Sequence, residues 1–291
     1  MDNPIKYRGS VTSQWGEDGI IEEIFKRIGT RNKVCVEVGA WDGKHLSNTW
    51  SLWHENEWSA LLVEGNQARI AILKSNTQGY ERVEIVPEYV SIEGSSALDS
   101  VLARHNALKN PDLLSIDVDG DDYHVFSGLR NFAPRLVIIE YNPTAPPEVD
   151  LVQTPGEYFG SSALALVKLA HAKGYKLVCC TETNCFFVLS SEYEALGIEE
   201  PTLRDVFPLD NLTYVVTSQD GRAFLTRSPT YGRLSAASLA SCLTHPTARV
   251  NSYPKLNGAD QIIPIILSVP RNTAQFSRNR MRRLWRRIGS K

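Results

Sequence analysis

Short apolar runs alternate with amphipathic segments along the first two thirds of the chain. The runs are rich in Val, Ile and Leu, which indicates buried strands, and they lie at 34–38, 60–63, 83–86, 113–116 and 136–141. Around them, apolar residues recur at a spacing of three or four, which predicts helices at 15–28, 44–56, 67–75, 97–105, 122–129 and 162–173. This alternation predicts an α/β domain with a mostly parallel sheet flanked by helices.

Two pairs of later runs have the pattern of hairpins. Residues 175–181 and 185–189 alternate in polarity around a short polar connection, which predicts an antiparallel hairpin. Residues 212–217 and 222–226 flank a second turn sequence and predict a separate hairpin. The Pro- and Gly-rich segment 144–160 is too long for a plain connection, and loops of that length often act as lids.

A glycine turn follows the first predicted strand. Gly39 ends the strand and Gly43 follows four residues later. A strand, a tight glycine turn and a helix form a binding site for nucleotide-like ligands at the carboxyl end of the strand. A dinucleotide site needs a second glycine where its backbone approaches the pyrophosphate, but Trp41 occupies that position here. The turn therefore favours a ligand that has no phosphate.

Two carboxylates flank this turn. Glu37 lies inside the first strand, and Glu64 follows the second. An acidic residue at the end of the second strand accepts the ribose hydroxyls in Rossmann-like folds, and Glu37 suits a cationic ligand. S-adenosylmethionine carries an amino group, a sulfonium and no phosphate, so the pair favours this cofactor over the simpler interpretation of two ordinary strand-end carboxylates. The turn residues that we expect to contact it are Gly39, Ala40, Asp42 and Gly43.

Further polar residues follow the fourth and fifth strands. Asp117 and Asp119 come after the fourth strand, and Glu140 and Asn142 lie at the end of the fifth. Carboxyl ends of neighbouring parallel strands meet at one edge of the sheet, so we expect these side chains to share a crevice. Carboxylate and amide oxygens suit Mg²⁺ or another divalent cation. Plain hydrogen bonding to a substrate is the alternative.

The same residues suggest how a hydroxyl could be activated. A divalent cation lowers the pKa of an alcohol and orients its oxygen for attack on a sulfonium methyl group. Without a metal, a base would take the proton, and the nearest histidines are His124 and His45. We therefore predict catalytic roles for Asp117 and His124. Asp121 and Asp122 have a simpler interpretation as caps of the helix that follows.

Five motifs appear in a fixed order over about residues 10–190. They are Ser13–Gly19 (SQWGEDG), Val36–Gly43 (VEVGAWDG), Leu62–Asn66 (LVEGN), Ile116–Gly120 (IDVDG) and Ile138–Asn142 (IIEYN). Together they resemble the FkbM-type family of S-adenosylmethionine-dependent methyltransferases. The resemblance implies a Rossmann-like class I methyltransferase sheet, mostly parallel with a terminal antiparallel hairpin, and a C-terminal extension. It also implies that Tyr89, after the third strand, lies at the adenine. Metal-dependent catechol-type and sugar O-methyltransferases take their metal ligands from the ends of the same two strands.

Three functional hypotheses follow. The leading one is an S-adenosylmethionine-dependent O-methyltransferase that acts on a hydroxyl of a sugar, glycan or secondary metabolite. The runner-up is a metal-dependent glycosyltransferase that uses Asp117-Val118-Asp119, a reading in which the glycine turn has no role. The third is a non-catalytic binding module of the methyltransferase fold. A retained cluster of mutually repelling carboxylates argues against this last hypothesis.

The amino-acid composition indicates the class of protein and the compartment in which we expect it. With 42% hydrophobic and 22% charged residues, the chain is typical of soluble globular proteins. It has no apolar run long enough to cross a membrane and no apolar leader at its start. The five cysteines follow no disulfide or zinc spacing, so we expect reduced thiols and a cytoplasmic location.

The charge is unevenly distributed. The chain has a net charge of −2, and residues 278–291 hold seven basic and no acidic residues, so the remaining 1–277 carries −9. An acidic body argues against a nucleic-acid partner. We predict a methyltransferase domain at 1–190, an accessory region at 191–274 and a basic tail at 275–291. The tail is either a solvated segment or a contact for a membrane surface or an anionic glycan, and a homo-oligomer is left open.

Overall fold

The computed structural model describes residues 1–105, 110–217 and 223–226. The chain divides into two compact units, Met1–Leu209 and Asp210–Lys291, which are described separately below.

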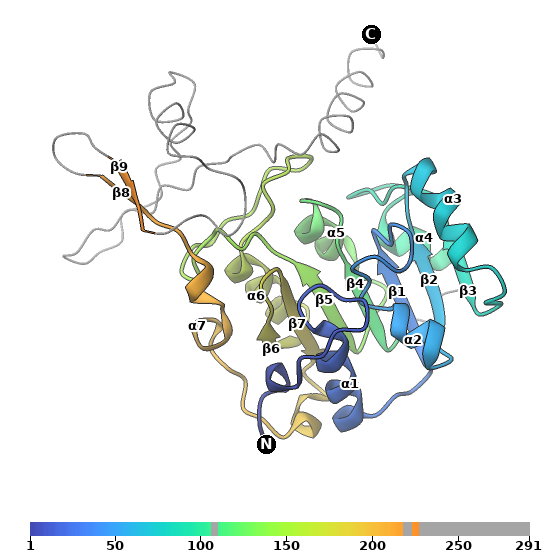
Figure 1. The fold of residues 1–291 in the computed structure, drawn as a ribbon, viewed down its shortest axis with the longest axis horizontal. Coiled ribbons are helices and arrows are strands. Elements are labelled where there is room, and N and C mark those ends of the chain that lie inside the picture. Colours follow the sequence, from blue (N-terminus) through green and yellow to red (C-terminus); the bar gives the residue numbers. More distant parts are fainter. Residues whose placement is uncertain (106–109, 218–222, 227–291) are drawn as a thin grey trace, which may run out of the picture. The chain divides into compact units, whose positions relative to one another are not determined.

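The first unit is built on one seven-stranded sheet (Figure 1). Its strands are β1 (Val34–Val38), β2 (Ser59–Val63), β3 (Val83–Val86), β4 (Leu113–Ile116), β5 (Leu136–Glu140), β6 (Tyr175–Cys180) and β7 (Asn184–Leu189). Their order is β3-β2-β1-β4-β5-β7-β6. The first five strands pair in parallel, and β7 lies antiparallel between β5 and β6. The predicted methyltransferase-type sheet with its terminal hairpin is thus confirmed.

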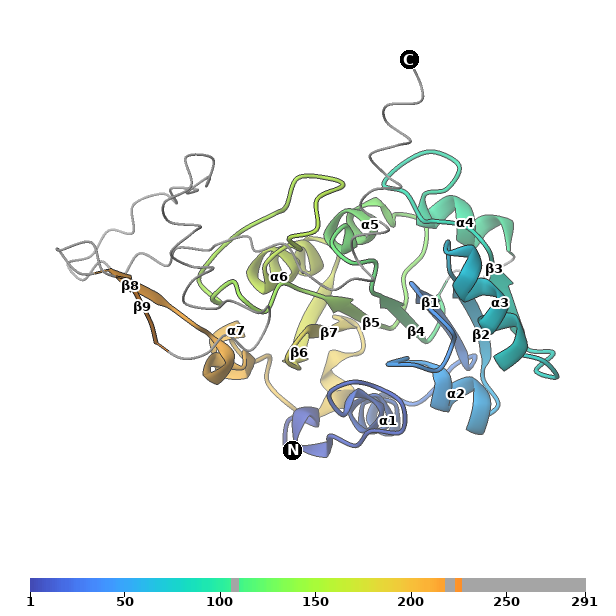
Figure 2. The same cartoon turned by 45° about the horizontal axis from the view of Figure 1, so that its top comes forward.

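Helices cover both faces of this sheet. They are α1 (Glu17–Ile28), α2 (Trp50–Glu55), α3 (Gln67–Asn76), α4 (Leu98–Arg104), α5 (Asp122–Gly128), α6 (Ala163–Ala172) and α7 (Leu203–Val206). Short 3-10 helices are η1 (Pro4–Tyr7), η2 (Tyr193–Leu196) and η3 (Leu209–Asn211). In Figure 2, α1 and α2 lie on one face of the sheet, and α4, α5 and α6 lie on the other.

One apolar cluster joins α1, α2 and α3 to the strands. Ile20 and Ile24 of α1 are completely buried, and Leu73 of α3 meets the same cluster. Helical spacing brings such residues onto one side of each helix, which packs on the apolar face of the sheet. Trp50 and Trp53 are also buried in this cluster, where they pack against the other apolar residues.

The predicted helix 44–56 is wrong in its first half. The helix α2 begins only at Trp50, and the residues before it form turns. Ser47 and Thr49 donate side-chain hydrogen bonds to the buried carboxylate of Glu37, and the backbone N–H of Asn48 does the same. A buried carboxylate must be satisfied by such donors, and this requirement overrides the helical pattern of the segment.

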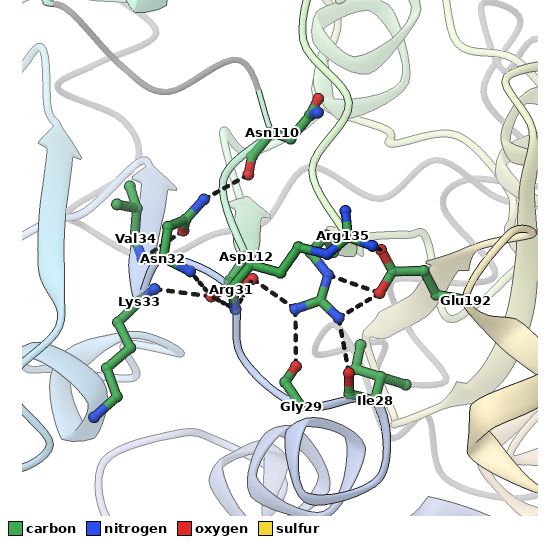
Figure 3. Close-up of polar contacts among 10 residues, drawn as sticks. All are labelled: Ile28, Gly29, Arg31, Asn32, Lys33, Val34, Asn110, Asp112, Arg135 and Glu192. Atoms are coloured by element: carbon green, nitrogen blue, oxygen red, sulfur yellow. Dashed lines mark hydrogen bonds and ion pairs between the residues drawn. The ribbon is translucent and has the colours of Figure 1, made fainter.

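A network of buried charges lies at the amino ends of β4 and β5 (Figure 3). The guanidinium of Arg135 donates to Asp112 and Glu192, and also to the last carbonyls of α1 and its C-cap, Ile28 and Gly29. The carboxylate of Asp112 also accepts hydrogen bonds from three successive backbone N–H groups, 31–33. This network joins the end of α1 to the start of three strands, at the edge of the sheet opposite the carboxyl ends of β1 to β5.

The second unit contains the predicted second hairpin, in which β8 (Val215–Thr217) pairs antiparallel with β9 (Ala223–Leu225). The predicted basic tail, 275–291, lies outside the described residues. Among the described residues, the helices are too short or too polar for any of them to cross a membrane.

Candidate active site

The glycine turn lies between the carboxyl ends of β2 and β4. The backbone N–H groups of Gly39 and Ala40 both donate to the carbonyl of Val63, at 2.9 and 3.0 Å. Gly39 has φ +88°, and a Cβ atom there would lie 1.8 Å from the carbonyl oxygen of Asp117. Only glycine fits such a close approach of two backbones. The turn is therefore held against the start of the acidic segment that follows β4.

Glu64 lies beside this turn, as its predicted role requires. Its side chain is buried, and its carboxylate accepts hydrogen bonds from the backbone N–H of Trp41 at 2.9 Å and of Asn66 at 2.6 Å. Burial raises the pKa of this carboxyl group. The guanidinium of Arg69 lies 4.0 Å from the centroid of the Trp41 ring and 3.8 Å from the Glu64 carboxylate. The turn and the end of β2 thus form one preorganised unit.

Glu37 binds the loop before α2. Its Oε2 accepts from Ser47 Oγ and Thr49 Oγ1, both at 2.7 Å, and its Oε1 accepts from the backbone N–H of Asn48 at 2.9 Å. Burial, together with the nearby charge of Asp117, raises the pKa of Glu37 to about 7 against the opposing effect of these hydrogen bonds. The polar sequence Ser47-Asn48-Thr49 could have indicated this contact. A direct contact of Glu37 with a ligand stays a prediction.

The remaining predicted cofactor residues frame the same edge of the sheet. Asp42 accepts hydrogen bonds from the backbone N–H groups of Lys44 and His45, at 2.9 and 2.7 Å, and so shapes the segment after the turn. Gly43 has φ +80° and lies against α3. The ring of Tyr89 packs directly on Gly65, where a Cβ atom would lie 2.2 Å from the ring, and about half of Tyr89 is exposed.

Three carboxylates meet at the ends of β4 and β5. Asp117, Asp122 and Glu140 each place one carboxylate oxygen within 4.8 Å of the others. The structure thus brings together two of the four predicted metal ligands and adds Asp122. Asp119 lies outside this trio, in a left-handed conformation with φ +59°. The amide oxygen of Asn142 accepts hydrogen bonds from Thr144, and its amide nitrogen donates to the carbonyl of Phe159.

Asp122 also shapes the turn between β4 and α5. Its two carboxylate oxygens accept hydrogen bonds from the backbone N–H groups of Val118 and Gly120, each at 2.9 Å. Burial raises the pKa of Asp122 to about 8, and the charge of Asp117 adds to the shift. A carboxyl group that is buried beside another carboxylate binds a proton more tightly, and a cation close to it would favour its ionised form.

The segment 144–160 is anchored on this acidic turn. Asp121 accepts hydrogen bonds from Gln153 Nε2 at 2.9 Å and from the backbone N–H of Gly156 at 2.8 Å. The interpretation of Asp121 as a side-chain helix cap is therefore wrong, since its carboxylate is engaged by the loop and makes no cap bond. Gln153 is buried, and sequence reasoning missed it because nothing in a polar loop marks which residue turns inward.

His124 contacts the same loop. Its Nε2 lies 2.8 Å from the carbonyl oxygen of Gln153. A carbonyl can only accept, so Nε2 carries the hydrogen, and Nδ1 of the neutral ring keeps its lone pair. His45, the alternative base, is exposed and its ring contacts Trp41 edge-on. The site therefore offers one histidine that is fixed in orientation and tautomer.

These features define a class of protein before any comparison is made. A sheet of this order, a glycine turn after β1 and an acidic residue after β2 are typical of class I methyltransferases. A family comparison adds that residues 84–177 match the methyltransferase FkbM domain. The FkbM-type resemblance is thereby confirmed, and this stretch includes Asp117, Asp122, His124 and Glu140. A search of curated proteins found no match.

Several solved structures resemble this one. The CMeT domain of the citrinin polyketide synthase is 14% identical, with a TM-score of 0.42, over 61% of this chain and 52% of that chain, which is about half its length. The N-terminal domain of EvdMO1 with SAH bound is 13% identical over 59% and 79% of the two chains, with a TM-score of 0.39. The glycopeptide N-methyltransferase MtfA complexed with (S)-adenosyl-L-methionine is 11% identical over 62% and 95%, with a TM-score of 0.36.

Proposed function

We propose that this protein is an S-adenosylmethionine-dependent methyltransferase that transfers the methyl group to a hydroxyl of a sugar, glycan or secondary metabolite. The observation that carries the proposal is the adjacency of two features at one edge of the sheet. The tight turn at Gly39 lies beside the buried carboxylate of Glu64, and the acidic trio begins where that turn touches Asp117. The FkbM domain match supports the methyltransferase activity.

In this proposal the cofactor lies across the ends of β1, β2 and β3. Glu64 already holds the turn by the N–H of Trp41, and its carboxylate oxygens have further lone pairs for the ribose hydroxyls. The half-exposed ring of Tyr89, fixed against Gly65, offers an apolar surface for the adenine. The backbone of the turn would approach the cofactor closely at Gly39, Ala40, Asp42 and Gly43.

The acidic trio would hold a divalent cation beside the cofactor. Asp117, Asp122 and Glu140 provide the hard oxygen donors that Mg²⁺ prefers, and their carboxylate oxygens lie within 4.8 Å of one another. When bound, such an ion would lower the pKa of the acceptor hydroxyl. His124, with its Nδ1 lone pair, would take the proton, and the anchored segment 150–160 would border the acceptor.

The cofactor role of Glu64 has a direct test. We expect Glu64→Ala to weaken binding of S-adenosylhomocysteine by about tenfold or more, because two charge-assisted hydrogen bonds to the ribose are lost. Glu57→Ala is the matched control, since Glu57 is an exposed acidic residue paired only with Arg82 at the surface. Calorimetric titration measures both variants beside the unaltered chain. Equal affinity in all three proteins would remove Glu64 from the cofactor site.

The cation role of the trio is tested separately. Mn²⁺ can stand in for Mg²⁺ and is detected by electron paramagnetic resonance when it binds. We expect Asp117→Asn to weaken Mn²⁺ binding strongly, because one of three anionic ligands becomes neutral. Asp150→Asn, at an exposed residue paired with Lys168, should leave Mn²⁺ binding unchanged. Identical binding in both variants would contradict the metal assignment.

A further inference from the structure

One buried polar atom beside the glycine turn has no hydrogen-bond partner. Asn48 is 6% exposed, and its side-chain Nδ2 donates to Ser115 Oγ at 3.2 Å. Its amide oxygen Oδ1 is buried and accepts no hydrogen bond from the described residues. Buried acceptors are nearly always satisfied, so an orphaned one at a candidate site indicates a donor that arrives with a ligand.

The surroundings of this oxygen are acidic. The backbone N–H of Asn48 donates to Glu37, and Ser115 lies directly opposite Glu37 in the register of β1 and β4. Asp117 follows Ser115 by two residues, and Asp117 is close enough for its charge to affect Glu37. Asn48 thus contacts one carboxylate directly and a serine that lies two residues before another, and such surroundings favour a donor that is itself positively charged.

The contacts of Asn48 place this residue close to the glycine turn. Glu37, which holds the Asn48 backbone, lies two residues before Gly39, and Gly39 touches the backbone of Asp117. Asn48 is therefore bonded to β1 and β4, the two strands whose ends meet at this turn. S-adenosylmethionine has two cationic groups. Its sulfonium has no N–H donor, whereas its ammonium has three.

We propose that Asn48 Oδ1 accepts a hydrogen bond from the ammonium group at the amino-acid end of the cofactor. This inference rests on the proposed function and assigns a residue to that end of the ligand. Asn48 is a binding residue held in place by Ser115 and by Glu37. A buried water or the hydroxyl of the methyl acceptor would be the other donors, and the experiment below separates them.

The test compares two ligands that differ in one group. The full chain is titrated calorimetrically with S-adenosylhomocysteine and with its deamino analogue, in which hydrogen replaces the amino group. We expect Asn48→Leu, which keeps the size of the side chain but has no acceptor, to weaken S-adenosylhomocysteine binding by about 10- to 100-fold. Binding of the deamino analogue should stay within about twofold, because the lost hydrogen bond was never made.

Asn56→Leu is the matched control. It makes the same exchange at an asparagine whose Nδ2 donates to the carbonyl of Ser51 and which has no role in the proposed site, so the preference for S-adenosylhomocysteine over the deamino analogue should be kept. Thermal unfolding shows whether each variant is folded, and Asn48→Ala replaces Asn48→Leu should leucine not be accommodated in the buried site.

The outcomes are distinct. An unchanged affinity of the Asn48 variant for S-adenosylhomocysteine would overturn the inference and assign the orphan to a water or to the acceptor hydroxyl. Equal weakening of both ligands would overturn it in favour of a purely structural role. A wild-type chain that binds neither ligand would contradict the proposed function itself, and the inference with it.

Discussion

Gly39 is the residue whose replacement has the most local consequence. Its φ of +88° disfavours a side chain, and its Cα lies so close to Asp117 that a Cβ atom would overlap the carbonyl oxygen. Gly79 has almost the same φ, +89°, but a Cβ there would meet nothing within 4 Å. Comparing the same substitution at the two glycines therefore separates the effect of backbone strain from that of steric overlap.

We expect Gly39→Ala to abolish S-adenosylhomocysteine binding and to lower the free energy of unfolding by more than Gly79→Ala does. Gly79→Ala should cost about 1–2 kcal/mol from the left-handed conformation alone and should leave binding unchanged. Urea unfolding and calorimetric titration measure the two effects. Equal destabilisation of the two variants would mean that the β1 turn and β4 are not in contact.

Glu37 should make the stability of the protein depend on pH. The folded protein keeps the Glu37 proton up to about pH 7, whereas the ordinary pKa is 4.5. Between these values the unfolded state binds fewer protons than the folded state, so the free energy of unfolding falls as pH rises and levels off above about pH 7. The glutamine of the Glu37→Gln variant cannot ionise, so in this variant the free energy of unfolding does not fall with pH on account of residue 37.

Urea unfolding at about pH 5 and about pH 8 measures the difference. The unaltered protein should lose up to about 3 kcal/mol more than Glu37→Gln over this interval, by the conversion of the pKa shift into free energy. Asp122 contributes a fall of the same sign in both proteins and so cancels. Parallel pH profiles would show that Glu37 is not buried as described.

Individual site residues could be predicted from the sequence where their position depends on their neighbours along the chain. Gly39 and Glu64 follow strands directly, and Asp117 and Glu140 end neighbouring strands, so their positions could be predicted. Gln153 could not be predicted, because its importance comes from a contact 32 residues away, with Asp121. Asp122 was interpreted as a cap because its backbone contacts with the preceding turn are not visible in a pattern of polar residues.

Among the elements, β4 and β5 are joined at both ends by charged groups, but with different consequences. At their amino ends Arg135 is 2% exposed and satisfies two buried carboxylates, Asp112 and Glu192 (Figure 3). At their carboxyl ends Asp117, Asp122 and Glu140 each place one carboxylate oxygen within 4.8 Å of the others. The amino ends thus hold a buried ion-pair network, and the carboxyl ends hold a cluster of acidic groups at the candidate site.

Arg135→Met should destabilise the protein by about 3–5 kcal/mol, because it leaves buried carboxylates without their counter-ion. It should leave S-adenosylhomocysteine affinity unchanged, since the network lies at the opposite edge of the sheet. Arg82→Met is the control, because Arg82 forms an exposed pair with Glu57 and should cost about 1 kcal/mol or less. Thermal and urea unfolding report the stability. A cost equal to that of the control would contradict the buried network.

The elements also show where pattern reasoning fails. The strands of the seven-stranded sheet were predicted to within a residue or two because each is a compact apolar run between breakers. The helix predicted from residue 44 was too long, because Ser47, Asn48 and Thr49 satisfy Glu37 instead of continuing a helical ladder. The hydrogen bonds that Glu37 accepts thus determine the backbone conformation of residues 47–49. Glu37 is distant in sequence, so a local pattern of polar and apolar residues cannot predict this conformation.

At the scale of the whole molecule, the order of motifs carries more information than any one of them. The D-x-D at Asp117 and Asp119 alone would also suit a glycosyltransferase. The structure gathers Asp117 with Asp122 and Glu140, beside a glycine turn and a buried Glu64 that a nucleotide-sugar site does not require. This combination favours the proposed methyltransferase over a glycosyltransferase.

The central claim is that the Gly39 turn and Glu64 bind S-adenosylmethionine and not a nucleotide sugar. Calorimetric titration of the full chain with S-adenosylhomocysteine, and in parallel with a uridine-diphosphate sugar, tests it most directly, each with and without Mg²⁺. The account predicts one S-adenosylhomocysteine site per chain that does not need the metal, and no nucleotide-sugar binding. Metal-dependent binding of the nucleotide sugar, with none of S-adenosylhomocysteine, would contradict it.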